Sequence, residues 1–113
     1  MEPRLTSAIL VSALLRRAES EGGFGAVLAK GDETAGSIVV ILLEKGGNPR
    51  IFERVLQAGG AYSWAESPTR PDDDAQKVPD FIARRRRFDP DSWFIELDVP
   101  SSERFADEMN SFG

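Results

Sequence analysis

Four consecutive arginines, Arg84 to Arg87, are the residues with the clearest chemical potential in this sequence. The guanidinium group offers a planar fork of donors that suits phosphate oxygens, so Arg84, Arg86 and Arg87 are candidate contacts to a phosphate or a nucleic acid. In a helix, however, four consecutive side chains point in directions about 100° apart, and few of them can share one ligand. Arginine is also favoured near a helix C-terminus by the helix dipole. A solvated helix face therefore explains the run better than a ligand does.

Arg85 has a different expected environment from the other three arginines. If residues 79–88 form a helix opened by Pro79, then Phe81 and Ile82 define its inward face and Arg85 points between them. A guanidinium buried under the helix needs a carboxylate, because an unpaired buried charge costs several kcal/mol. We therefore predict a structural ion pair between Arg85 and a nearby acidic side chain, the candidates being Asp89, Asp91 and Glu96.

Acidic side chains suggest a second kind of chemistry. Glu96 and Asp98 lie two apart on a predicted strand and share one face, and Glu53 and Glu44 could join them in a carboxylate-based, metal-assisted hydrolase. Alternating apolar and charged residues are, however, typical of any half-exposed strand. The acidic run at residues 72–74 lacks the spacing and the glycine of a calcium loop, and it is more typical of a solvated loop. We predict no metal and no cofactor.

Composition limits the available chemistry further. The 113 residues include no His and no Cys, and 14 basic against 19 acidic side chains give a net charge of −5. Without His, the chain lacks the commonest general base and the commonest transition-metal ligand. The negative charge argues against a surface that binds phosphates everywhere. The composition therefore favours a protein that is not an enzyme, and any nucleic-acid site would have to be local.

Length and hydropathy indicate one soluble domain over residues 1–113. The apolar stretch at residues 8–15 is followed by Arg16 and Arg17 where a signal peptide would have its small-residue cleavage site, so we expect no secretion. The apolar run at residues 38–43 is far shorter than the ~20 residues of a membrane-spanning helix. With no Cys to oxidise, a cytoplasmic location is expected.

The first half of the chain predicts one helix and four strands. Residues 5–21 read as a helix that ends at a glycine pair, although residues 4–11 also alternate as a strand would. Strands are predicted at residues 24–29, 37–44, 50–57 and 61–66, joined as an antiparallel meander. The run at residues 38–43 has no polar alternation, so we expect it to lie centrally with both faces covered.

The second half predicts a loop, two helices and a strand. Residues 67–77 are polar and contain two prolines, so they read as a surface loop before the arginine-rich helix. A strand at residues 92–98 follows, and then a helix capped by Ser101 or Ser102, with Phe105 and Met109 facing inward. The predicted fold is α+β: a small, mostly antiparallel sheet packed with an N-terminal helix, an arginine-rich helix and a short C-terminal helix.

Several segments resemble a known bacterial family. They are Leu14–Glu19, Gly31-Asp32-Glu33 with Ala35-Gly36, Phe52-Glu53-Arg54, and Ile82–Asp91 with Trp93. By these segments the sequence is similar to the alphaproteobacterial domain of unknown function family 1491 (DUF1491), and the arginine run ending in Phe88–Asp91 is the most specific of them. The resemblance implies a bacterial, cytoplasmic protein. It implies no activity, and no catalytic residues can be carried over.

Three functions compete at this point. The favoured hypothesis is a non-catalytic interaction domain that binds a protein partner or itself as a homodimer, because the sheet has strand edges available for pairing. The alternative, a nucleic-acid or phosphate binder, requires Arg84, Arg86 and Arg87 to converge with other arginines (Arg16, Arg17 or Arg50). The hydrolase requires its carboxylates, Glu53, Glu96 and Asp98, to converge in a cleft.

Overall fold

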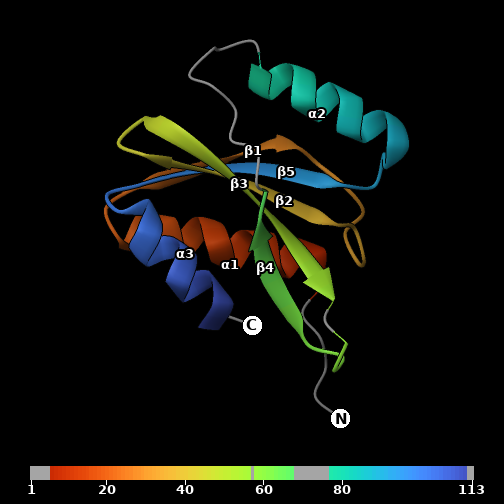
Figure 1. Cartoon of the computed structure of the whole chain (residues 1–113), viewed down its shortest axis with the longest axis horizontal. Coiled ribbons are helices and arrows are strands. Elements are labelled where there is room, and N and C mark those ends of the chain that lie inside the picture. Colours follow the sequence, from red (N-terminus) through yellow and green to blue (C-terminus); the bar gives the residue numbers. More distant parts are fainter. Residues whose placement is uncertain (1–5, 57, 68–76, 112–113) are drawn as a thin grey trace.

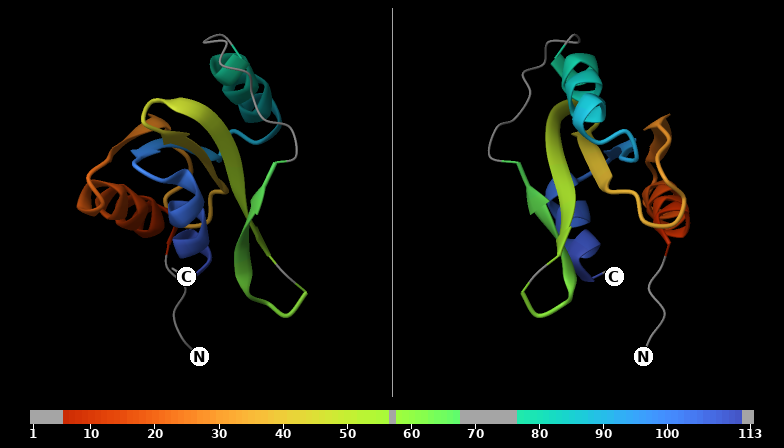
Figure 2. Two further views of the ribbon diagram at one scale, coloured as in Figure 1. Left: turned by 60° about the vertical axis from the view of Figure 1, so that its left-hand side comes forward. Right: turned by 90° about the vertical axis from the view of Figure 1, so that its right-hand side faces the viewer.

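A five-stranded sheet lies between helices on both of its faces (Figure 1, Figure 2). The computed structural model describes residues 6–56, 58–67 and 77–111. Helices α1 (Ser7–Ser20) and α3 (Ser102–Ser111) cover one face, and α2 (Lys77–Phe88) covers the other. The strands are β1 (Phe24–Ala29), β2 (Ile38–Glu44), β3 (Gly47–Leu56), β4 (Tyr62–Glu66) and β5 (Trp93–Val99). The predicted α+β class is confirmed.

The strand order is β1-β5-β2-β3-β4. β5 pairs antiparallel with β1 and parallel with β2, so the predicted meander holds only from β2 to β4. β5 is almost as apolar as β2, and its residues Trp93, Phe94 and Ile95 are at most 4% exposed. A strand buried on both faces gains most at the centre of a sheet. β1, which contributes the small residues Gly25 and Ala26, lies at the edge.

Each face of the sheet has its own hydrophobic cluster. On the side of α1 and α3, alternate residues of β2 and β5 pack against Leu10, Leu14 and Phe105 of the helices. On the side of α2, the intervening residues pack against Phe81 and Ile82. The central position expected for residues 38–43 is therefore confirmed, and helices provide the cover on both faces.

The start of α1 shows why the N-terminal segment is a helix and not a strand. Thr6 is the N-cap, and its Oγ1 accepts the backbone N–H of Ile9 at 3.3 Å. The backbone N–H groups of Ser7 and Ala8, the first two residues of the helix, donate to the carbonyls of Thr34 and Glu33, respectively. All of these donors would be unsatisfied at a bare helix end. Residues 1–5 lie outside the described part of the chain.

The turn between β2 and β3 is tighter than predicted. Lys45 and Gly46 have φ of 49° and 82°, the paired positive angles of a two-residue hairpin turn. β3 therefore begins at Gly47 rather than at Arg50. Pro49 lies within this strand, where the pairing register with β2 shifts, and such a bulge tolerates the missing N–H of proline.

The remaining helix bounds differ slightly from the prediction. α2 begins at Lys77, which places Pro79 in the first turn, where a missing N–H costs nothing. The backbone N–H of Arg104 donates to Ser101 Oγ at the start of α3, and Phe105 and Met109 are buried as predicted. Most of the loop predicted at residues 67–77, including its acidic run at residues 72–74, falls in the segment 68–76, outside the described residues, and Lys77 is already part of α2. None of the helices in the described ranges is long and apolar enough to cross a membrane.

Candidate functional site

The three arginines proposed as phosphate contacts are all exposed on α2. Arg86 turns toward the end of β1 and donates to the carbonyl of Lys30 at 3.4 Å. The arginines of α1 lie on the opposite face of the sheet, and Arg50 forms a bidentate pair with Glu66, with N–O distances of 2.8 and 2.9 Å. The structure therefore does not bring the α2 arginines together with the other three.

Arg85 is the least exposed arginine of the run, but it is only partly buried, and its partner differs from the prediction. Its guanidinium pairs with the carboxylate of Glu53 on β3, and the two side chains are 33% and 32% exposed. Glu53 faces α2 because it pairs with Val39, whose side chain lies in the cluster under that helix. Asp89 instead accepts the backbone N–H of Asp91 at 3.2 Å. A partner so distant in sequence becomes visible only in the folded sheet.

The carboxylates proposed for a hydrolase are dispersed. Glu53 is paired with Arg85, and Asp98 accepts the backbone N–H of Gly46 at 3.0 Å. Glu44 lies at the other face of the sheet, where it accepts the N–H of Ser102 at the start of α3. Within residues 6–56, 58–67 and 77–111, no three acidic side chains are close enough to share a metal ion. Of the proposed set, only Glu96 lines a large cavity.

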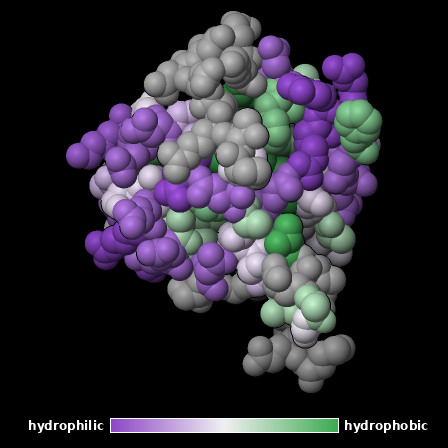
Figure 3. Space-filling view, viewed as in Figure 1, coloured by the Kyte–Doolittle hydropathy of each residue, from purple (hydrophilic) through white to green (hydrophobic). Residues whose placement is uncertain are grey.

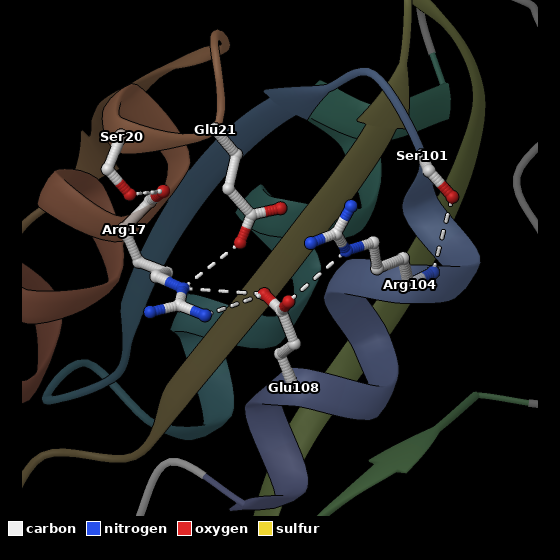
Figure 4. A network of polar contacts seen from close by, with 6 residues as sticks. All are labelled: Arg17, Ser20, Glu21, Ser101, Arg104 and Glu108. Atoms are coloured by element: carbon white, nitrogen blue, oxygen red, sulfur yellow. Dashed lines mark hydrogen bonds and ion pairs between the residues drawn. The ribbon is translucent and has the colours of Figure 1, made fainter.

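A network of charges joins α1 to α3 (Figure 4). Arg17 of α1 contacts Glu21 at 3.0 Å and Glu108 of α3 at 3.2 Å, and Glu108 also pairs with Arg104 at 3.4 Å. Burial and a hydrogen bond to Glu108 raise the pKa of Glu21. The same hydrogen bond, together with Arg17, lowers the pKa of Glu108. The network fixes one helix against the other and has the features of a structural contact.

A groove of about 780 Å³ separates α2 from the sheet beside it. Its walls come from one side of α2, from β1, β5 and β2, and from the β2–β3 turn. Figure 3 shows hydrophobic surface at the level of α2, with hydrophilic side chains around it. Most lining side chains are apolar, and the two charged ones are Arg86 and Glu96; the apolar ones are Leu28, Ala29, Ile41, Leu43, Pro49, Val78, Pro79, Ile82 and Ala83.

The second candidate surface is the edge strand β1. Phe24, Val27 and Leu28 are 64%, 43% and 42% exposed, and the strand contains no charged residue and no proline. Natural edge strands usually carry such residues, because an uncovered apolar edge pairs with other strands. The opposite edge, β4, is protected, because the backbone N–H of Trp64 donates to Asn110 Oδ1 of α3 at 2.9 Å. In the described part of the chain, no side chain hydrogen-bonds the backbone of β1 in this way.

The protein-family comparison decides the family. The model described as a protein of unknown function (DUF1491) matches residues 5–107. The chain belongs to the DUF1491 family. No curated protein matches it.

Solved DUF1491 structures have the same fold. The crystal structure of a DUF1491 family protein from Caulobacter crescentus is 31% identical, with a TM-score of 0.77 over 90% of this chain and 94% of that one. A solution structure of an A. tumefaciens protein is 28% identical, with a TM-score of 0.75 over 91% and 92%. The DUF1491 family is a family of unknown function.

The sequence predicts strand edges available for pairing, but it identifies neither β1 as the exposed edge nor the groove under α2. The signal for the edge was present, since residues 24–29 form a short strand without a single charge. The position of β1 at the edge depends on β5 entering the sheet beside it, which no local pattern reveals. The groove depends on where α2 crosses the sheet, and this too is a property of the fold.

Proposed function

We propose that this DUF1491 protein is a non-catalytic interaction domain that associates with a second copy of itself through the β1 edge. The observation that carries the proposal is the exposed, uncharged and apolar β1, which offers unpaired backbone groups along an uncovered edge. Association of two identical edges is the simplest outcome, because two-fold dimers are the commonest oligomers. The absence of cysteine supports a cytoplasmic location.

The side chains of β1 are compatible with two-fold pairing. Phe24, Ala26 and Leu28 lie on the α2 face of the sheet, whereas Gly25 and Val27 lie on the other face. A two-fold axis through Ala26 would place Phe24 opposite Leu28 of the second copy, and Gly25 opposite Val27. Phe24 and Leu28 then form an apolar cross-strand pair, and Val27 lies opposite the small Gly25. Residues that share a face within one copy also share a face of the combined sheet.

The interface of one short strand pair is small, so the expected dimer is weak. Such interfaces lie below about 1,200 Å², in the size range of transient contacts. The net charge of −5 on each copy opposes association, and added salt is therefore expected to strengthen the dimer.

Sedimentation equilibrium between about 10 µM and about 1 mM tests the proposal. We expect wild type to pass from monomer to dimer, and Val27→Lys to weaken association at least about tenfold because it introduces a charge on the edge. Ile9→Lys is the matched control, since Ile9 is also an exposed apolar residue, at 52%, but lies on α1. A monomeric wild type throughout, or equal association of the two variants, would contradict the proposal.

A further inference from the structure

The groove under α2 has the dimensions and lining of a small-molecule site. Its volume of about 780 Å³ lies within the range of roughly 300–1,000 Å³ found for ligand pockets. Val78, Ile82 and Ala83 form one wall on α2, and Ile41 and Leu43 form part of the floor on β2. An apolar body of a ligand would replace water along these surfaces.

The carboxylate of Glu96 gives the groove its polarity. Glu96 lies on β5, between β1 and β2, and its half-buried side chain lines the groove. No group in the described part of the chain forms a hydrogen bond or an ion pair with this carboxylate, whereas Glu53 and Asp98 both have partners. A half-buried carboxylate without a partner is stabilised when a hydrogen-bond donor or a cation binds beside it.

The other charge of the groove, Arg86, is placed differently. Arg86 is exposed, and its guanidinium already donates to the carbonyl of Lys30. The group that lacks a partner is thus the acidic one. We propose that the groove binds a small amphiphilic amine, with its ammonium group at Glu96 and its apolar chain along α2.

Calorimetric titration with three probes of equal chain length tests the site: decylamine, decanol and decanoate, each below its aggregation concentration. We expect one decylamine per chain, bound at least about tenfold more tightly than decanol or decanoate, because a hydrogen-bonded ion pair adds to the same apolar contact. Glu96→Gln should reduce the affinity for decylamine about tenfold and leave the affinity for decanol unchanged. Thermal melting checks that this variant is folded.

Three further variants locate the binding site in the groove and separate ligand binding from dimerisation. Ala83→Trp, which fills the groove and keeps Glu96, should abolish binding of all three probes. Glu19→Gln removes the same charge on α1, across the sheet, and should bind decylamine as wild type does. Val27→Lys should also bind it normally, since Val27 lies on the opposite face from the groove. Absence of decylamine binding by wild type, equal binding of the three probes, or tighter binding of decanoate through Arg86 would overturn the proposal.

Discussion

At the scale of single residues, the ion pair between Arg85 and Glu53 is the charged contact that joins α2 to β3. Both side chains are about one third exposed, so solvent weakens the pair relative to a fully buried one. Arg85→Ala is therefore expected to lower the free energy of unfolding by about 1–2 kcal/mol, and Arg87→Ala by less than about 0.5 kcal/mol. Urea denaturation of both variants measures the difference.

A double-mutant cycle with Glu53→Ala assigns the Arg85 effect to the pair. The loss in the double variant should be smaller than the sum of the two single losses. Equal stability of the Arg85 and Arg87 variants, or strictly additive losses, would show that this ion pair does not hold α2 to the sheet.

The network of Arg17, Glu21 and Glu108 makes two opposing contributions to the pH dependence of the free energy of unfolding. Glu108 has a lowered pKa, so its contribution to stability is present above its ordinary pKa and is lost as the pH falls through the lowered value. Glu21 has a raised pKa, so its contribution is present at low pH and is lost as the pH rises through the raised value. The two contributions therefore partly cancel in the pH dependence of stability.

Carboxyl NMR titration between about pH 2 and pH 7 resolves the two groups. Glu21 should titrate at higher pH than Glu108, and Arg17→Ala should raise the pKa of both, because Arg17 lowers each of them. Arg16→Ala, a change at the neighbouring exposed arginine, is the control. Titration of Glu108 above Glu21 would refute the assignment.

At the scale of elements, β2 is the central and most deeply buried strand of the sheet. Residues 38–42 are at most 1% exposed, with β5 and β3 on either side and helices over both faces. Its amides should open only with global unfolding and exchange most slowly of all the strands. Hydrogen exchange followed by NMR measures this. Exchange in β2 as fast as in the edge strands β1 and β4 would contradict this role.

The elements themselves were largely predictable from local patterns. The limits of β1 were predicted to the residue, and the unbroken apolar run identified the central strand. The start of β3 was not predictable, because proline usually marks a turn: Pro49 falls between the strands predicted at residues 37–44 and 50–57, whereas in the structure it lies in a bulged strand. The strand order was not predictable, because the insertion of β5 between β1 and β2 depends on contacts between distant segments. The partner of Arg85 and both candidate surfaces follow from that order.

At the scale of the whole molecule, the two candidate surfaces lie close together but need not act together. Leu28 of β1 lines the groove, whereas Val27 next to it faces the other side of the sheet. Changes at Val27 should therefore alter association without altering the groove, and changes at Ala83 should do the reverse. This separation makes β1 pairing testable by itself.

Cysteine cross-linking tests the β1 pairing most directly, because the chain has no cysteine of its own. In the two-fold register Ala26 faces its own copy at about 4.5–5.5 Å between Cα atoms, within reach of a disulfide. Val27 is offset from its own copy by about 7–8 Å, beyond that reach. Under mild oxidation Ala26→Cys should form a covalent dimer rapidly, and Val27→Cys and Ile9→Cys only slowly. Equal, slow cross-linking of all three variants would contradict self-association through β1.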